Sequence, residues 1–165
     1  MAQSLNCAIL TVSDTRTPAT DTSGNWLAET LARAGHTCVA RDIVKDDIYQ
    51  IRRVISTWIA DERVQVILTT GGTGFSHRDS TPEAVLPLFD QTIDGFGELF
   101  RQISFAQIGS STIQSRAVAG TANGTLIFCL PGSTHACETA WEGILREQLD
   151  FTHKPCNFAT HFPDA

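Results

Sequence analysis

Short apolar runs alternate with helical repeats in the first part of the chain. The apolar runs cover residues 7–12, 38–44 and 64–69, and each is bounded by residues typical of turns. Between them, apolar residues recur at three- and four-residue steps over 26–34 and 48–59, which is the period of an amphipathic helix. Strands that alternate with helices are typical of a parallel sheet with right-handed crossovers. The pattern therefore predicts an α/β fold.

Two helices are predicted in the middle of the chain. Thr81 is expected to cap the first, because Pro82 follows it in a first turn where a missing N–H does no harm. Glu83 suits the positive end of the same helix. The second helix is expected over 94–104, where apolar residues share one side.

An antiparallel hairpin is predicted after these helices. The strand-like runs 116–122 and 125–130 are separated by Asn123-Gly124, a dipeptide that suits a type I′ turn because both turn positions need a positive φ. A last helix is expected to run to about residue 149. The tail over 151–165 has no period and is expected to be extended.

Composition narrows the class of protein. The 165 residues are 42% hydrophobic and 18% charged, with a formal net charge of −6. The hydrophobic share excludes a disordered chain, and the low charged fraction indicates additional buried surface between subunits. The acidic charge disfavours nucleic acid and membranes as partners but leaves room for a local anion site. We predict one α/β domain over residues 1–165, a three-layer sandwich whose mostly parallel sheet has an antiparallel hairpin addition.

The cysteines and the apolar runs indicate the compartment. Cys7, Cys38, Cys129, Cys137 and Cys156 are scattered and form no C-x-x-C pair, which fits neither a disulfide framework nor a zinc ribbon. No apolar run approaches the ~20 residues that a membrane helix needs, and the start of the chain has no basic signal-peptide segment. We expect a cytoplasmic protein.

A glycine-rich segment follows the third apolar run. Its sequence is Thr69-Thr70-Gly71-Gly72-Thr73-Gly74, at the end of a strand where ligands of open α/β sheets bind. Glycines let backbone N–H groups approach an anion without interference from a Cβ. The spacing is that of neither a dinucleotide fingerprint nor a P-loop. The segment predicts either an anion site or a tight strand-to-helix turn.

Charged residues flank the glycine segment. Asp79 and Glu83 follow it closely, and a carboxylate beside a polyphosphate usually holds Mg²⁺. Arg78 is able to pair with a phosphate. Asp46 follows the second strand and should reach the same edge of the sheet. Structural roles remain open as well, since Asp79 suits a turn and Asp46 or Asp47 suits a helix N-cap.

Two further segments end at that edge. Ser13-Asp14 follows the first strand, and Pro131-Gly132-Ser133 leads from the last strand into a helix N-terminus, which favours anions. Four separate segments thus place small, hydroxyl or acidic residues together. Their convergence is stronger than any one motif.

These motifs together resemble the molybdenum cofactor biosynthesis family MoaB/MogA, which also includes the G domain of gephyrin. The similarity extends over nearly the whole chain and is greatest to the bacterial MoaB branch. The chain departs from many members at Thr15, where they have a basic residue. The matching motifs are TVSD at 11–14, DTSG at 21–24, TTGGTG at 69–74, HRDSTPEA at 77–84, GFGE at 95–98, SRAVAG at 115–120 and LPGS at 130–133.

The resemblance implies a three-layer α/β fold, a homotrimer or a hexamer built from two trimers, and binding of molybdopterin. In catalytic members, ATP and Mg²⁺ adenylylate the terminal phosphate of molybdopterin and pyrophosphate is released. The aspartates important in those members fall on Asp46 and Asp79. A molybdate-insertion enzyme is implied as a further partner.

The resulting hypothesis is a molybdopterin adenylyltransferase. Asp46 and Asp79 are its expected catalytic residues, holding Mg²⁺ and orienting the attacking phosphate, with ATP as co-substrate. One alternative is a non-catalytic molybdopterin-binding or carrier protein of the same pathway, and another is an enzyme for a different phosphorylated metabolite. The expected substrate-binding residues are Ser13, Gly71, Gly72, Thr73, Gly74, Arg78, Glu83, Gly132 and Ser133.

Overall fold

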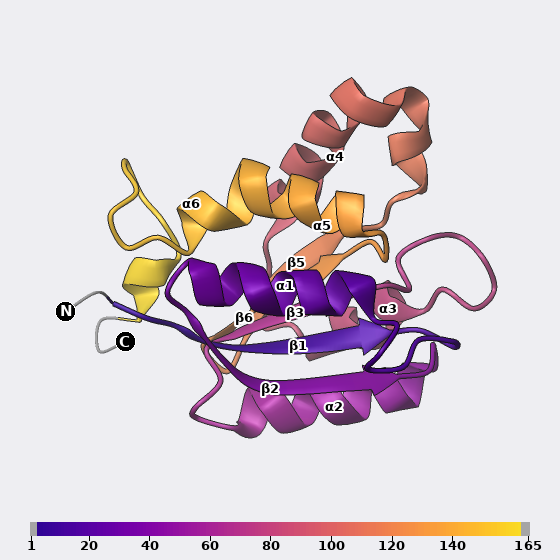
Figure 1. Ribbon diagram of the computed structural model, residues 1–165, viewed down its shortest axis with the longest axis horizontal. Helices are drawn as coiled ribbons and strands as arrows, with labels where there is room; N and C mark the ends of the chain where they lie inside the picture. The colour runs from indigo at the N-terminus through magenta and orange to yellow at the C-terminus, as the bar shows by residue number, and fades with distance from the viewer. Residues whose placement is uncertain (1–2, 163–165) are drawn as a thin grey trace.

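A computed structural model describes residues 3–162 and contains one six-stranded sheet (Figure 1). The strand order is β2-β1-β3-β6-β5-β4, in which the first four strands are parallel and the β6-β5 and β5-β4 pairs are antiparallel. The mixed sheet confirms the predicted α/β class. The strands are β1 (Asn6–Val12), β2 (Thr37–Val44), β3 (Val66–Thr70), β4 (Gln91–Thr92), β5 (Val118–Ala122) and β6 (Thr125–Leu130).

Aspartates fix the starts of the two long crossover helices. Asp21 caps α1, its carboxylate accepting from the Gly24 amide, and Asp47 caps α2 by accepting from Tyr49 and Gln50. Each cap satisfies amides that have no partner inside the helix. The helices are α1 (Thr22–Arg33), α2 (Ile48–Ala60), α3 (Thr81–Val85), α4 (Asp94–Ile108), α5 (Thr134–Ala140) and α6 (Arg146–Gln148), with a π-helical stretch η3 (Trp141–Leu145) and 3₁₀ turns η1 (Leu86–Leu88), η2 (Gly109–Gln114) and η4 (Ala159–His161).

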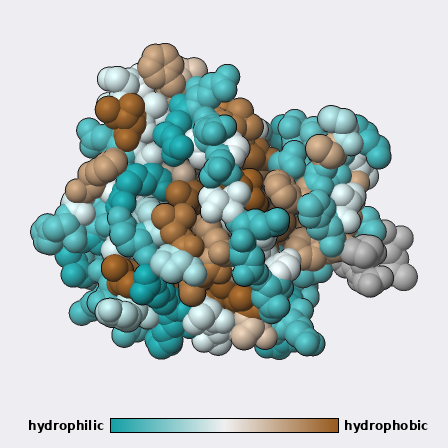
Figure 2. Space-filling view, turned by 180° about the vertical axis from the view of Figure 1, so that it is seen from behind, coloured by the Kyte–Doolittle hydropathy of each residue, from teal (hydrophilic) through white to brown (hydrophobic). Residues whose placement is uncertain are grey.

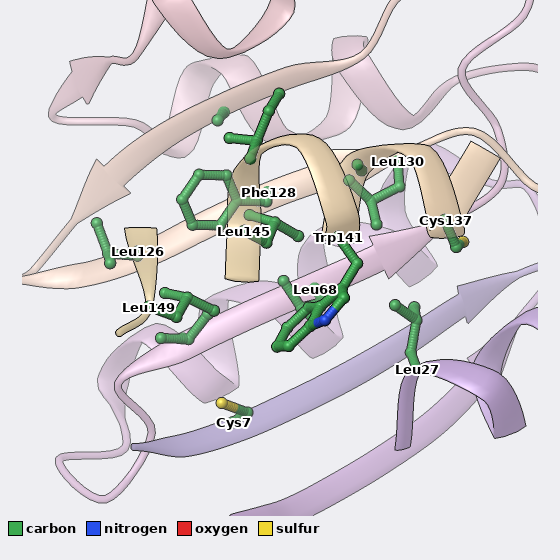
Figure 3. Packing of buried hydrophobic residues seen from close by; sticks show 14 of the residues in the cluster. Cys7, Leu27, Leu68, Leu126, Phe128, Leu130, Cys137, Trp141, Leu145 and Leu149 are labelled. Carbon is green, nitrogen blue, oxygen red and sulfur yellow. The ribbon is translucent and has the colours of Figure 1, made fainter. Parts of the chain in front are cut away.

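The sheet lies between two layers of helices. Side chains of β1 alternate, so that Cys7 and Ile9 face the cluster under α1, α4 and α5, while Ala8 and Leu10 face α2 and α3. This alternation follows from the two-residue period of a strand. Figure 3 shows the first cluster, where Phe128 of β6 lies beside Leu145 of η3. Both faces of the sheet are therefore covered, as in the predicted three-layer sandwich.

The hairpin turn has the predicted geometry. Asn123 and Gly124 have φ angles of 50° and 77°, and β5 pairs with β6 in antiparallel register. Glycine and asparagine tolerate this left-handed region better than other residues do. The hairpin positions β6 in the middle of the sheet.

Several boundaries differ from the sequence expectations. Thr81 does not cap α3 but is its first residue, because its hydroxyl donates to the Gly71 carbonyl instead. Asp46 is not the cap of α2, a role that belongs to Asp47. The short strand β4 and the 3₁₀ turn η2 have too little periodicity to be predicted.

The tail is not extended within the described residues. Buried Asn157 donates to the His153 carbonyl and accepts from the Thr160 amide, which folds the segment into turns ending in η4. Phe158 packs against Phe128 with ring centroids 6.4 Å apart. The prediction missed this packing because single long-range contacts leave no period in the sequence. Residues 163–165 of the predicted tail lie outside the described part.

The face seen in Figure 2, which is the rear of the view in Figure 1, is largely hydrophilic with apolar stretches between the hydrophilic residues. Leu99, Phe105, Ile108 and Ile113 of α4 and η2 are exposed. Among the helices of residues 3–162, none is both long and apolar enough to cross a membrane.

Candidate functional site

A cavity of about 510 Å³ opens at the edge where the parallel strands end. The segments after β1, β2, β3 and β6 meet there, because parallel strands deliver their carboxyl ends to the same side of a sheet. The predicted residues that line it are Ser13, Asp46, Gly71, Gly72, Thr73, Gly74, Arg78, Asp79 and Gly132.

The glycine loop brings three backbone segments of the chain into contact. Gly71 and Gly72 have φ angles of 105° and 73°, which side-chain-bearing residues rarely adopt. A Cβ on Gly71 would lie 2.2 Å from the Val12 carbonyl oxygen, and a Cβ on Gly132 would lie 3.3 Å from the Gly71 Cα. The loop therefore requires glycine for its path and for its close packing.

Thr81 holds the loop through two carbonyls and leaves the inner amides of the loop available. The Thr81 hydroxyl donates to the Gly71 carbonyl at 2.9 Å, and the Thr81 amide donates to the Gly72 carbonyl at 3.0 Å. The Gly71 amide donates to Leu130. Within residues 3–162, the amides at positions 72–74 donate to no protein acceptor. These amides can bind an anion.

Asp46 is a buried carboxylate on the wall of the cavity. It is 8% exposed, and its Oδ1 accepts from the Ser80 amide at 3.0 Å and the Ser80 hydroxyl at 2.6 Å. Burial raises the pKa of Asp46, and the nearby charges of Asp79 and Asp14 add to that effect, although the Ser80 hydrogen bonds oppose it. Burial disfavours the charged form of this carboxylate, and a bound cation would favour it.

Asp14 and Arg78 form a two-point ion pair at the mouth of the cavity. The Arg78 Nε and Nη2 donate to Oδ2 and Oδ1 of Asp14 at 2.9 and 2.8 Å. The hydrogen bonds from Arg78 and from the Asp46 amide lower the pKa of Asp14 to about 2. Arg78 thus lines the cavity, as predicted, with its Nε and Nη2 donors occupied by Asp14.

Asp79 lies on the loop between β3 and α3 and lines the same cavity as Asp46. Its Oδ2 accepts from the Ser76 amide at 2.9 Å. A Cβ on Gly74 would lie 2.7 Å from the same oxygen, so glycine at 74 lets the carboxylate sit against the backbone. The turn role and the cavity-lining role of Asp79 coexist.

Two predicted residues lie outside the cavity lining. The Ser133 hydroxyl accepts from the Ala136 amide and caps α5. The Glu83 carboxylate pairs with Arg116. Their side chains are used in holding neighbouring segments.

The cavity also contains residues that sequence reasoning missed. Arg16 reaches it one position after the departure at Thr15. The Ser115 hydroxyl is buried and has no partner within the described chain. In the sequence, only the SRAVAG motif could have pointed to Ser115 as a site residue, and no motif pointed to Ser111 and Gln114 of η2. Asp14, Thr70 and Pro131 lie in segments that were expected at this edge, although they were not named as site residues. The lining residues without that expectation are Thr11, Val12, Arg16, Ser23, Ser111, Gln114 and Ser115.

The acidic residues suit one kind of metal ion. The described residues contain no group of three or more His, Cys, Asp or Glu side chains placed to hold a metal. Asp46 and Asp79 offer two carboxylates to the same cavity. Mg²⁺ is commonly bound by one or two carboxylates together with substrate phosphates, whereas zinc takes four protein ligands or three. The donor set therefore fits Mg²⁺ accompanied by a phosphate ligand.

Comparisons with known proteins identify the family. A family model described as "Probable molybdopterin binding domain" matches residues 8–150. Molybdenum cofactor biosynthesis protein B of Escherichia coli K12 is 57% identical over 154 residues, which cover 93% of this chain and 91% of that protein.

Solved structures agree in fold. A crystal structure of a molybdenum cofactor biosynthesis protein B matches with a TM-score of 0.87 at 45% identity, covering 90% of this chain and 93% of that one. The tungsten cofactor synthesizing protein MoaB from Pyrococcus furiosus matches with a TM-score of 0.77 at 35% identity, covering 89% of this chain and 94% of that one. The chain therefore belongs to the MoaB/MogA family of molybdenum cofactor biosynthesis proteins.

Proposed function

We propose that this protein binds molybdopterin at the carboxyl edge of its sheet and adenylylates its terminal phosphate with ATP and Mg²⁺. The observation that carries the proposal is that Asp46 and Asp79 line one cavity together with the glycine loop. Loop amides without protein acceptors suit phosphate oxygens, and two carboxylates suit a cation that accompanies them.

The loop amides and Arg78 act by binding and orientation. Phosphates of either substrate accept from the amides at positions 72–74, and the part of the Arg78 guanidinium that Asp14 does not occupy faces the same anions. Phosphoryl and nucleotidyl transfers require little covalent participation by the protein, so positioning and charge stabilisation account for most of the acceleration.

Asp46 and Asp79 are the residues that would hold Mg²⁺. Ser80 fixes one oxygen of Asp46 and the Ser76 amide fixes one oxygen of Asp79, so each carboxylate has a second oxygen available to a cation. The ion, when bound, neutralises charge on the triphosphate.

The reaction itself is a nucleotidyl transfer. An oxygen of the terminal phosphate of molybdopterin attacks the α-phosphorus of ATP, a new P–O–P bond forms, and the bond to pyrophosphate breaks. The products are adenylylated molybdopterin and pyrophosphate, and no redox change is involved. Asp46 and Asp79 orient the attacking phosphate against the α-phosphorus.

Asp79→Ala tests the assignment. Adenylylation measured as pyrophosphate release should fall by at least about 1,000-fold, whereas molybdopterin retention should change little, because the loop amides remain. Asp42→Ala is the matched control, since Asp42 is an exposed aspartate that accepts only from the adjacent Ile43 amide. Chelation of Mg²⁺ should stop the wild-type reaction. Wild-type turnover by Asp79→Ala would refute the catalytic assignment.

The same assay separates transferase from carrier. A wild-type protein that retains molybdopterin but releases no pyrophosphate at saturating ATP and Mg²⁺ would be a binding or carrier protein of the pathway. A protein that retains no molybdopterin would contradict both readings.

We further propose that the chain assembles as a trimer or as a dimer of trimers. Leu99, Phe105, Ile108 and Ile113 are exposed apolar side chains on α4 and η2, and burial between copies would remove them from water. Light scattering should give three or six times the chain mass of 17.9 kDa. A mass of one chain would contradict the assembly.

A further inference from the structure

One arginine outside the cavity holds the loop that presents Asp79. The Arg116 Nε donates to the Gly74 carbonyl at 2.9 Å, and its Nη2 donates to the Asp79 carbonyl at 3.1 Å. Its Nη1 pairs with the Glu83 carboxylate. The Arg116 amide donates to the Thr73 carbonyl at 2.9 Å. One residue therefore contacts the beginning, middle and end of the segment 73–83.

The chemistry of the guanidinium explains why one side chain can do this. Arginine presents several donors in a rigid plane and stays charged at every accessible pH, whereas lysine is a single flexible point charge. The Arg116 side chain is 24% exposed, and the Phe75 ring covers it with its centroid 5.0 Å from the guanidinium carbon. Partial burial strengthens charge-assisted hydrogen bonds.

Arg116 is itself anchored to the rest of the fold. It lies two residues before β5, and Arg101 of α4 donates to the adjacent Ala117 carbonyl at 3.2 Å. The loop 73–83 is thereby tied to the sheet and to α4 by side chains that do not line the cavity. Asp79 itself is held at three points: its amide donates to the Ser76 carbonyl, one carboxylate oxygen accepts from the Ser76 amide, and its carbonyl accepts from Arg116.

We propose that Arg116 is a positioning residue, which fixes the Asp79 carboxylate by holding the carbonyls of Gly74 and Asp79, with Glu83 as its counter-ion. The expected effect of Arg116 on catalysis rests on the proposed function. Its expected effect on the structure of the loop rests only on the contacts described here. It also gives Glu83 a role, since its carboxylate orients Arg116 and has no need to touch substrate.

The loop can be tested without any activity. In Arg116→Ala, hydrogen exchange at the amides of Ser76, Asp79 and Ser80 should accelerate by about tenfold or more. Arg52→Ala is the matched control, because Arg52 also donates to two carbonyls, those of Glu83 and Ala84 within α3, but to none between residues 73 and 80. Arg52→Ala should leave exchange in the loop within about twofold of wild type. Unchanged exchange in Arg116→Ala, or equal acceleration in both variants, overturns the proposal.

Kinetics give the second arm. Arg116→Ala should lower kcat by about 100-fold while the KM for ATP changes by less than about threefold, because the loop amides still bind phosphate and only the carboxylate is displaced. Arg116→Lys should recover little of the loss, since it cannot reach three acceptors. A change confined to KM would indicate a direct contact with substrate and would overturn the positioning role.

A double-mutant cycle tests the role of Glu83. Glu83→Ala alone should lower kcat by about fivefold, since two of the three contacts of the Arg116 side chain remain, and Arg116→Ala with Glu83→Ala should be no worse than Arg116→Ala alone. Additive losses would show that the two residues act independently and would overturn the counter-ion role. An inactive wild-type protein would refute the adenylyltransferase function but leave the exchange result to decide whether Arg116 holds the loop.

Discussion

The cavity at the strand ends and a second cavity at the far side of the helices differ in what their walls contain. The second is larger, about 810 Å³, and lies beside the end of α1 and the stretch η3–α6, with Trp26, Trp141 and Phe151 among its lining residues. Its charges are partly paired, since Arg146 and Glu142 lie 3.1 Å apart and both are exposed. The smaller cavity has glycine backbone and buried carboxylate instead.

The difference shows that volume does not identify the site in this fold. Parallel strands bring four chain segments to one edge, so backbone amides and short side chains concentrate there by topology. The second cavity is assembled from side chains at helix ends, which could be exchanged without changing the path of the chain. Substitutions in the two places should therefore have very different effects.

The largest effect is expected from Gly71→Ala. Its Cβ would lie 2.2 Å from the Val12 carbonyl oxygen and its φ is 105°, so both sterics and backbone strain oppose alanine. The free energy of unfolding should fall by about 3 kcal/mol or more, and ligand retention should be lost. Gly35→Ala is the control, since Gly35 has a φ of 87° but open space around it, and about 1–2 kcal/mol is expected. Equal losses in denaturant titrations would contradict the claim that the glycine loop is sterically unique.

A smaller effect of opposite sign is expected from Asp46→Asn. Burial raises the pKa of Asp46 in the folded protein, so stability from this group is full below the ordinary pKa of about 4 and is lost as the pH rises through the folded value. At pH 7 the neutral asparagine should therefore give a higher melting temperature than wild type, together with loss of adenylylation.

The pH series provides the check. The stability difference between Asp46→Asn and wild type should disappear as the pH falls below about 4. Asp47→Asn, one residue away, keeps a helix cap because asparagine is an equally good capping residue, and it should leave melting temperature and activity nearly unchanged. A stability gain that persisted at low pH would rule out titration of Asp46 as its cause.

The smallest effect is expected in the second cavity. Arg146→Ala removes an exposed pair with Glu142, which should change stability by less than about 1 kcal/mol. The affinities for molybdopterin and ATP should remain within about twofold of wild type. A clear loss of either affinity would show that the second cavity takes part in ligand binding and that the two cavities do not differ in function.

The periodic part of the fold was predictable, and the aperiodic part was not. The parallel strands and the hairpin follow from apolar runs and from Asn123-Gly124, because burial on a sheet and positive φ leave local signals. The folded tail depends on hydrogen bonds made by one buried residue, Asn157, which no period reveals. Short elements such as η2 depend on tertiary contacts alone.

The sequence predicted the position of backbone segments at the candidate site better than the direction of its side chains. Glycines and aspartates at strand ends were placed by topology, so Asp46, Asp79 and the loop line the cavity as expected. Glu83 and Ser133 were close in sequence to the edge, but the direction of each side chain was settled by partners elsewhere, Arg116 and the Ala136 amide. Chain proximity predicts a neighbourhood, and only packing decides which way a side chain points.

The contact between Gly71, Val12 and Gly132 has a consequence for how such a site diverges. Three backbone segments meet there, so the shape of the pocket depends on positions where the backbone, and not the side chain, makes the contact. Substitutions of the surrounding hydroxyl and charged residues can then change which ligand is preferred while the backbone structure of the pocket stays the same. In saturation mutagenesis, the glycine positions at this contact should tolerate fewer substitutions than the charged positions around the pocket.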